Sequence, residues 1–272
     1  MTSRARDGLI AGLVTRAEAA AHAAGKLVLH RPAVMQIDSK SSLTDSVTEM
    51  DRASEALLVE MLLEGRGEDA ILGEEGADRA GTSGVRWVID PIDGTTNYIY
   101  RIPMWSVSVG IELDGDSVGG VVHVPAIGET YLARDGQGAI GRTPSGEQQL
   151  RVTDIKELSM ALVATGFGYV GTRRNSQAAV VRETLPRMRD IRRTGCASMD
   201  LCWLAAGRLD AYYERGLKPW DLCAGGVIAR EAGARIEGLN GQAAGEDLVI
   251  AANPDLFPAL HDLLAELKAA SG

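Results

Sequence analysis

Several residue types are scarce in this 272-residue chain, and each scarcity argues against a class of protein. Only 4% of the residues are aromatic, so aliphatic side chains must supply most of the core packing. The cysteines Cys196, Cys202 and Cys223 are odd in number and show no CxxC spacing. They therefore read as reduced thiols of a cytoplasmic protein, and a disulfide framework or zinc site is not expected.

Basic runs and long apolar runs are also missing, and we expect no targeting signal. The formal net charge is -9 and no cluster of Lys or Arg stands out, which argues against nucleic acid or an anionic membrane as a partner. No run approaches about 18 apolar residues, so we expect no membrane-spanning helix. The apolar run after Arg4 and Arg6 is too short for a signal peptide.

The patterns that are present predict an α/β protein in two parts. Residues 6–30 and 51–65 have helical patterns, the second with Ala53, Leu57, Leu58, Met61 and Leu62 on one face, and a polar loop lies between them. Strands follow at 70–76 and 84–90, and an antiparallel meander runs over 106–138 with turns near Gly115, Gly128 and Gly136. A surface turn over 141–149 suggests a boundary between an N-terminal α+β lobe, 1–145, and a C-terminal α/β lobe, 146–272.

The second part alternates strands with helices, which is typical of an α/β lobe. We expect a strand over 160–167, a helix over 174–189, a short strand, and a helix over 198–207. A strand over 209–215, a helix over 220–233, a strand over 248–253 and a terminal helix from Pro254 complete it.

The segment VRWVIDPIDGTTNY, residues 85–98, ends an apolar strand with two carboxylates three residues apart. Asp90 is expected where the strand leaves the core. Pro91 stiffens the turn and Gly94 permits a positive φ. Two ionised carboxylates held this close repel each other, so a proton or a cation must relieve the repulsion. Because the neighbours offer oxygen atoms and neither histidine nor thiolate, Mg²⁺ is the natural cation.

The residues after Gly94 predict an anion site beside this cation. Thr95 or Thr96 suits the cap of a following helical turn, whose backbone N–H groups can receive an anion. Metal ions next to an anion cradle indicate a phosphate site.

Other acids have a simpler interpretation when each is taken alone. Glu74 and Glu75 follow a strand and should point to opposite faces, so one is a ligand candidate and the other supports it or is solvated. Asp51 follows Thr48 by three residues, which fits a capping box.

The C-terminal half offers a second set of candidates. Asp221 lies in the first turn of a helix, where a carboxylate is favourable with the helix dipole in any protein. Gly195 precedes a helix with Ala197 or Ser198 in its first turn, which is either a second cradle or an ordinary helix start.

Four segments together resemble the inositol monophosphatase family, part of the lithium-sensitive, Mg²⁺-dependent phosphatase superfamily. They are SKSSLTDSVTEMD at 39–51, GEEG at 73–76, DPIDGTTNY at 90–98 and LKPWDLCAGG at 217–226. The resemblance runs from about Lys40 to Asn253 with matching order and spacing. It implies an alternating α-β-α-β-α sandwich of the inositol monophosphatase and fructose-1,6-bisphosphatase type, usually homodimeric.

The resemblance also implies roles for individual residues, with two to three Mg²⁺ ions per site and hydrolysis by metal-activated water. The implied metal ligands are Glu74, Asp90, the carbonyl of Ile92, Asp93, Thr95 and Asp221. The implied catalytic residues are Glu74, Thr95 and Asp51, the last pairing with Thr95. The implied phosphate and substrate contacts are Asp93, Gly94, Thr95, Thr96, Gly195, Ala197, Glu214 and Lys40.

The resemblance does not identify the substrate. Leu43 stands where many relatives have proline, and Lys218 and Pro219 lie where relatives vary. The sequence DGTTNY and Glu214 favour an inositol phosphate over other sugar or polyol phosphates. The alternatives are a sister phosphatase of the same fold, acting on histidinol phosphate, fructose 1,6-bisphosphate, NADP or a 3′-phosphoadenosine nucleotide, and a regulatory binding protein of the transcription machinery.

Overall fold

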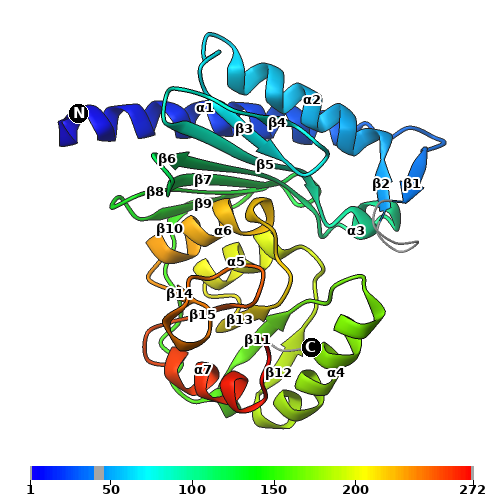
Figure 1. The fold of residues 1–272 in the computed structure, drawn as a ribbon, viewed down its shortest axis with the longest axis vertical. Helices are drawn as coiled ribbons and strands as arrows, with labels where there is room; N and C mark the ends of the chain where they lie inside the picture. Colours follow the sequence, from blue (N-terminus) through cyan, green and yellow to red (C-terminus); the bar gives the residue numbers. More distant parts are fainter. Residues whose placement is uncertain (1, 40–45, 271–272) are drawn as a thin grey trace.

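Helical and sheet layers alternate in this protein, as Figure 1 shows for the computed structural model. The structure describes residues 2–39 and 46–270. Helices α1 and α2 cover one face of an eight-stranded sheet, α5 and α6 lie between this sheet and a five-stranded one, and α4 and α7 form the last layer. The α-β-α-β-α sandwich expected from the sequence is therefore confirmed. The helices are α1 Ser3–Leu29, α2 Glu49–Leu63, α3 Thr95–Ile99, α4 Gly171–Thr184, α5 Ala197–Ala205, α6 Pro219–Glu231 and α7 Phe257–Glu266.

The eight-stranded sheet contains the predicted meander. Its strands lie in the order β10-β9-β8-β7-β6-β5-β3-β4, antiparallel except for the parallel pair β3 and β5. The turns at Gly115, Gly128 and Gly136 all have positive φ, as their glycines predicted. The strands are β3 Ala70–Gly73, β4 Asp78–Arg79, β5 Val85–Asp93, β6 Ser106–Leu113, β7 Asp116–Val124, β8 Glu129–Arg134, β9 Ala139–Thr143 and β10 Gly146–Gln149.

The five-stranded sheet has mixed topology, in the order β12-β11-β13-β15-β14. β11 is parallel to both of its neighbours, whereas β15 is antiparallel to β13 and β14. A further two-stranded ribbon pairs β1 with β2. These strands are β1 Ile37–Ser39, β2 Ser46–Thr48, β11 Leu162–Thr165, β12 Asp190–Arg192, β13 Ala211–Glu214, β14 Arg235–Glu237 and β15 Val249–Ala252.

Several element predictions were wrong in detail. The expected surface turn over 141–149 contains most of a β-hairpin, β9 with β10, and the expected lobe boundary falls inside it. The expected polar loop contains β2, and β14 was missed because three alternating residues give too short a signal. The expected helix over 174–189 ends at Thr184, since Pro186 turns the chain into a 3₁₀ helix, Leu185–Arg187. The terminal helix begins at Phe257, three residues later than expected.

The buried face of α2 also differs from the prediction. Ala53 is exposed, whereas the polar residues Asp51, Ser54 and Glu55 are buried together with Leu58. Carboxylates were not expected on an inward face, and both of these acids make contacts described below.

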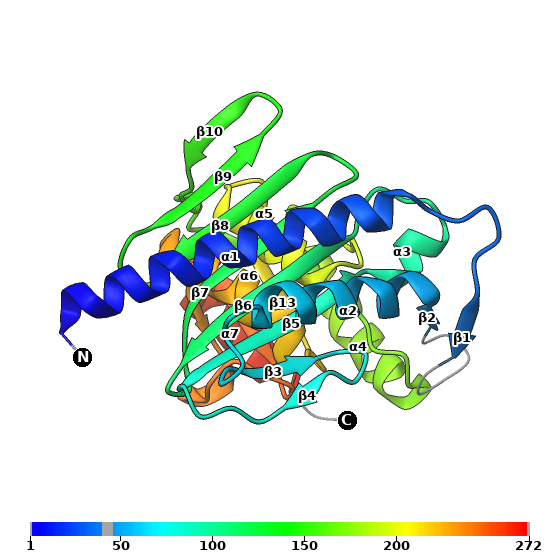
Figure 2. The same cartoon turned by 90° about the horizontal axis from the view of Figure 1, so that it is seen from above.

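Small residues let helices approach the sheet closely, which compensates for the few aromatic side chains. Figure 2 shows α1 and α2 lying along the same face of the sheet, and α1 buries alanines at positions 17, 20, 21 and 24. On the other face, a Cβ at Gly110 would overlap the Cys223 sulfur, and one at Gly120 would lie 2.6 Å from Cα of Ala224. These glycines of β6 and β7 therefore allow α6 to lie directly against the sheet.

None of the helices in the described part of the chain is long and apolar enough to cross a membrane.

Candidate active site

Strand β5 is longer than the sequence suggested, and both Asp90 and Asp93 lie on it. The strand was expected to end at Asp90, but it continues to Asp93, with a register shift against β6 between the two aspartates. Pro91 lies in this irregularity, where a strand tolerates a residue without an N–H group. The bulge places both carboxylates at the same end of the sheet.

Gly94 ends the strand and begins the short helix α3. Its φ of 91° lies in the left-handed region, and it is the N-cap residue. The expectation that Thr95 or Thr96 caps the helix was therefore wrong, because both lie inside α3. A Cβ at Gly94 would lie 3.1 Å from the carbonyl oxygen of Gly195, so the two predicted cradles meet here.

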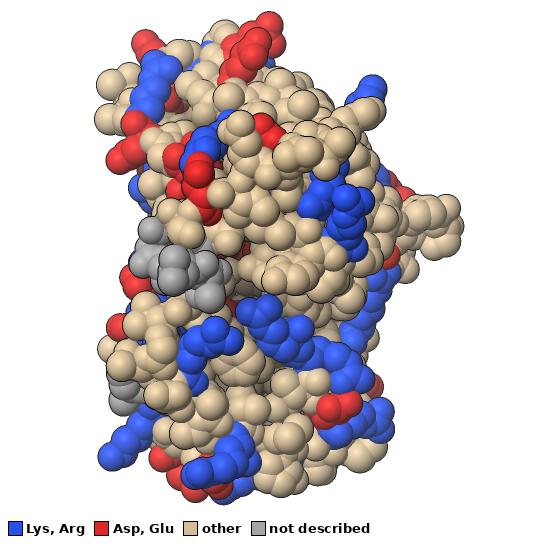
Figure 3. Space-filling view, turned by 90° about the vertical axis from the view of Figure 1, so that its right-hand side faces the viewer, with Lys and Arg blue, Asp and Glu red and all other residues tan. Residues whose placement is uncertain are grey.

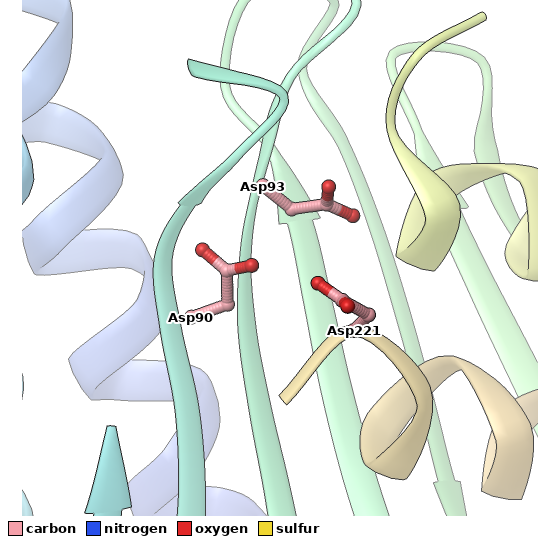
Figure 4. A group of neighbouring side chains, drawn as sticks. All are labelled: Asp90, Asp93 and Asp221. Atoms are coloured by element: carbon pink, nitrogen blue, oxygen red, sulfur yellow. The ribbon is translucent and has the colours of Figure 1, made fainter. Parts of the chain in front are cut away.

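Three carboxylates converge at this point. One oxygen from each of Asp90, Asp93 and Asp221 lies within 4.8 Å of the others. Figure 4 shows the two β5 aspartates and the one from the start of α6 pointing toward a common centre. The Lys218 N–H donates to Oδ2 of Asp221 at 2.6 Å, which fixes the Asp221 side chain against its own helix start.

Asp93 is oriented by α5. Its Oδ2 accepts the Ser198 N–H at 2.7 Å, the Ser198 hydroxyl at 2.6 Å and the Cys196 thiol at 3.3 Å. Burial raises the pKa of Asp93, and the hydrogen bonds from Ser198 and Cys196 oppose that rise by stabilising the charged form. Ser198 therefore holds a carboxylate, a role that the sequence did not reveal.

Burial and mutual repulsion make the ionised form of these three carboxylates unfavourable unless a positive charge lies nearby. Burial raises the pKa of Asp90 well above its usual range, and the negative charges of Glu74, Asp93 and Asp221 raise it further. Burial, followed by the charge of Asp93, likewise raises the pKa of Asp221. A divalent cation would relieve this repulsion. Because all the donor atoms are carboxylate oxygens, the residues fit a hard cation such as Mg²⁺.

Glu74 and Glu75 point to different hollows, as expected, but both lie in the turn after β3, which ends at Gly73, and not on the strand that the prediction assumed. Glu74 lines the same cavity as the three aspartates, and its charge acts on the pKa of Asp90. Glu75 lines a different hollow, next to Arg52. Glu55 on α2 fixes the turn between β3 and β4, because its carboxylate accepts the N–H groups of Glu75 at 2.8 Å and Ala77 at 2.9 Å.

Asp51 forms the capping box that its spacing from Thr48 predicted, and it also contacts Thr95, as the family resemblance implied. It forms the capping box of α2 with Thr48, whose N–H donates to Asp51 Oδ2 at 2.8 Å. Its other oxygen, Oδ1, lies 3.0 Å from the Thr95 hydroxyl, which also lies 3.1 Å from the carbonyl oxygen of Ile92. Asp51 is fully buried and reaches the site through Thr95.

A cavity of about 430 Å³ joins most of the expected site residues. Its lining includes the expected substrate contacts Gly94, Gly195, Ala197 and Glu214. Thr96 is not among the lining residues, and Lys40 lies outside the described residues.

Glu214 lines this cavity, and the pKa of its carboxyl group is raised. Burial raises its pKa to about 7, opposed by a hydrogen bond from the Tyr212 hydroxyl at 2.7 Å and by the charge of Arg193. A Cβ at Gly166 would overlap the Glu214 carboxylate, so only glycine fits beneath it.

Sequence reasoning named Lys218 but missed the arginines of the cavity and one amide. Arg173, Arg193 and Arg215 line it, and only the pair of arginines directly before Thr194 and Gly195 was a signal in the sequence. Asn97 donates from Nδ2 to the carbonyl oxygens of Met104 and Thr194 at 2.6 and 2.8 Å, which joins α3 to the segment before α5.

The model of the inositol monophosphatase family matches residues 12–270. The chain belongs to the inositol monophosphatase family.

Relatives in this family carry two kinds of name. A protein named inositol-1-monophosphatase from Mycobacterium leprae is 46% identical over 243 residues, which cover 87% of this chain and 82% of that protein. A protein named Nus factor SuhB from Pasteurella multocida is 39% identical over 202 residues, 74% of each chain. The solved structure of Mycobacterium tuberculosis SuhB has a TM-score of 0.82 at 40% identity and covers 96% of this chain and 99% of that one.

Proposed function

We propose that this member of the inositol monophosphatase family is a Mg²⁺-dependent phosphate monoester hydrolase whose preferred substrate is an inositol 1-phosphate. The observation that carries the proposal is the convergence of Asp90, Asp93 and Asp221 at a cavity that also exposes Gly94 and Thr95. Carboxylates that hold hard cations beside a helix start form a site suited to a phosphate ester.

The residues that would hold the cations are those at the end of β5 and their distant partners. Asp90, Asp93 and Asp221 would share one ion, and Glu74, the Ile92 carbonyl and Thr95 would complete the others, two to three in all. A bound Mg²⁺ supplies Lewis-acid activation of water and neutralises charge on the phosphoryl group.

The protein's own groups position the reactants. Glu74 and Thr95 orient the attacking water, and Asp51 fixes the Thr95 hydroxyl through its bond of 3.0 Å. The backbone N–H groups that follow Gly94 hold phosphoryl oxygens as charge redistributes. Glu214, Gly195 and Ala197 line the part of the cavity where the polyol hydroxyls would bind.

A regulatory role is the second candidate, favoured by the relative named Nus factor SuhB. In that role the protein would act mainly by binding a component of the transcription machinery. An Asp93→Asn variant that loses turnover but keeps the wild-type phenotype in its host would support it, and loss of both together would oppose it.

The test of the proposed function is phosphate release from a panel of esters with Mg²⁺. The panel contains inositol 1-phosphate, histidinol phosphate, fructose 1,6-bisphosphate, NADP and a 3′-phosphoadenosine nucleotide. We expect inositol 1-phosphate to be hydrolysed with the highest kcat/KM among the monoesters, and Asp93→Asn to reduce its turnover by orders of magnitude because a ligand charge is lost.

Millimolar Li⁺ should inhibit the reaction, as the family resemblance implies. Release that does not exceed that of Asp93→Asn on any ester would contradict the proposal. We further propose a cytoplasmic homodimer, also on the resemblance.

A further inference from the structure

Arg193 differs from two other basic residues of the cavity wall because it has no bonded partner. Figure 3 shows Lys and Arg side chains gathered on the lower half of the molecule, along the border with the upper half. Of those that line the cavity, Lys218 Nζ lies 2.8 Å from Oε1 of Glu246, and Arg173 Nη2 lies 3.8 Å from the same oxygen. The Arg193 guanidinium makes neither a hydrogen bond nor an ion pair with any residue that the structure describes. Its N–H donors are therefore available to a ligand.

Arg193 and Glu214 each lie over a glycine of the cavity wall. A Cβ at Gly195 would overlap Nη1 of Arg193, and a Cβ at Gly166 would overlap the Glu214 carboxylate. All four residues line the cavity. Gly195 has a φ of 86°, in the left-handed region that favours glycine. The two glycines thus leave room for the polar ends of Arg193 and Glu214 to lie against the backbone in the same cavity.

Two buried acids attract Arg193 without bonding to it. Asp200 of α5 is fully buried, and its Oδ1 has no hydrogen-bond partner among the described residues. Burial raises the pKa of Asp200 well above its usual range, and the Thr194 side chain and the charge of Arg193 oppose that rise. The charge of Arg193 likewise opposes the rise that burial causes in the pKa of Glu214. Within the described part of the chain no ion pair joins Arg193 to either acid, so its guanidinium is held near them with its donors unused.

We propose that Arg193 is a specificity-determining residue of this reaction, whose guanidinium donates to a hydroxyl of the leaving polyol next to the hydroxyl that Glu214 binds. This inference rests on the proposed function, which places the polyol against Glu214, Gly195 and Ala197. A guanidinium offers five N–H donors and no acceptor, whereas a carboxyl group offers acceptor oxygens. The two side chains are therefore complementary to two neighbouring hydroxyls of one ring, and esters of a polyol are preferred over esters whose alcohol has no other hydroxyl.

The test compares two cyclohexane phosphates that differ only in their ring hydroxyls, inositol 1-phosphate and cyclohexyl phosphate. Arg193→Ala should lower kcat/KM for inositol 1-phosphate about tenfold through a higher KM, because the lost charge-assisted hydrogen bond is made in the ground state and the transition state alike. It should change kcat/KM for cyclohexyl phosphate less than about threefold. Arg189→Ala is the matched control, since Arg189 is an exposed arginine that does not line the cavity.

A binding measurement keeps the inference independent of turnover. Calorimetry with Mg²⁺ in the Glu74→Gln background should show about tenfold weaker binding of inositol 1-phosphate after Arg193→Ala and unchanged binding after Arg189→Ala. An equal loss on both esters would place Arg193 on the phosphate group and overturn the inference. Unchanged affinity for inositol 1-phosphate after Arg193→Ala would also overturn it, whereas absence of hydrolysis with intact Arg193-dependent binding would contradict only the proposed function.

Discussion

At the scale of single residues, the site depends on groups that orient the carboxylates. Asp93 is the clearest case, because three donors from the start of α5 converge on one of its oxygens. Such partners fix the direction of a metal ligand and tune its charge. We therefore expect them to contribute to cation affinity without contacting the cation.

Ser198→Ala tests this support. The change removes the 2.6 Å hydroxyl bond to Asp93 and leaves the backbone bond. We expect the Mg²⁺ concentration for half-maximal phosphate release to rise by about 10-fold to 100-fold. Ser83→Ala is the control, since the Ser83 hydroxyl makes an equivalent bond of 2.7 Å to Asp69, which does not line the cavity. Equal Mg²⁺ dependence in the two variants would show that Ser198 does not support the site.

The raised pKa of Glu214 predicts that the free energy of unfolding depends on pH. Its pKa is raised to about 7 in the folded protein, so the folded state binds more protons than the unfolded state between the ordinary carboxyl range and pH 7. Its contribution to stability is therefore present at low pH and is lost as pH rises through 7. At pH 8 the buried charge costs roughly 3 kcal/mol.

Glu214→Gln should remove this cost. Denaturant unfolding in EDTA should show the variant gaining stability relative to wild type as pH rises from about 4.5 to 7, with a constant difference above that range. Glu68→Gln, at an exposed position, serves as the control. A difference that does not vary with pH would show that Glu214 is not the perturbed group.

At the scale of elements, two irregular segments place the proposed metal ligands. The bulge in β5 brings Asp90 and Asp93 to one end of the sheet, and the turn after β3 places Glu74 beside them. The turn depends on Glu55 of α2, which accepts two backbone N–H groups. A helix that packs on the outer face of the sheet thus fixes the position of a residue in the cavity.

Glu55→Ala tests the link from α2 to the turn. Loss of two charge-assisted hydrogen bonds should lower the free energy of unfolding by roughly 2 kcal/mol or more. It should also reduce Mg²⁺-dependent turnover, since Glu74 lies directly before one of the freed N–H groups. Glu60→Ala, exposed on the same helix, is the matched control for loss of charge. Wild-type turnover and stability after Glu55→Ala would contradict this role.

The sequence predicted which acidic residues meet at the site better than it predicted the residues that hold them in place. Asp90 and Asp93 were identifiable because their motif combines a strand end with a glycine turn, whereas the metal role of Asp221 was implied only by the resemblance to the family. Ser198, Glu55 and Asn97 were not, since each acts on a residue distant in the chain and such contacts exist only after packing. β14 and the β9–β10 hairpin were missed because their strands are short and lack a clear apolar alternation.

At the scale of the whole molecule, the site exists because two sheets share a helical layer. Helix α6 lies against the eight-stranded sheet, made possible by Gly110 and Gly120, and its first turn delivers Asp221 to the end of β5. Residues 131 positions apart in the chain, Asp90 and Asp221, thus meet at one centre. The central claim is that this meeting creates a cation site for phosphate ester hydrolysis.

The most direct test is the rate of phosphate release from inositol 1-phosphate as a function of Mg²⁺ concentration for Asp221→Asn, with Asp116→Asn at the exposed start of β7 as the control. The account predicts that Asp221→Asn lowers the rate by more than about 100-fold, beyond the range for groups that only support a ligand. The control should match wild type. A wild-type rate and Mg²⁺ dependence in Asp221→Asn would contradict the account.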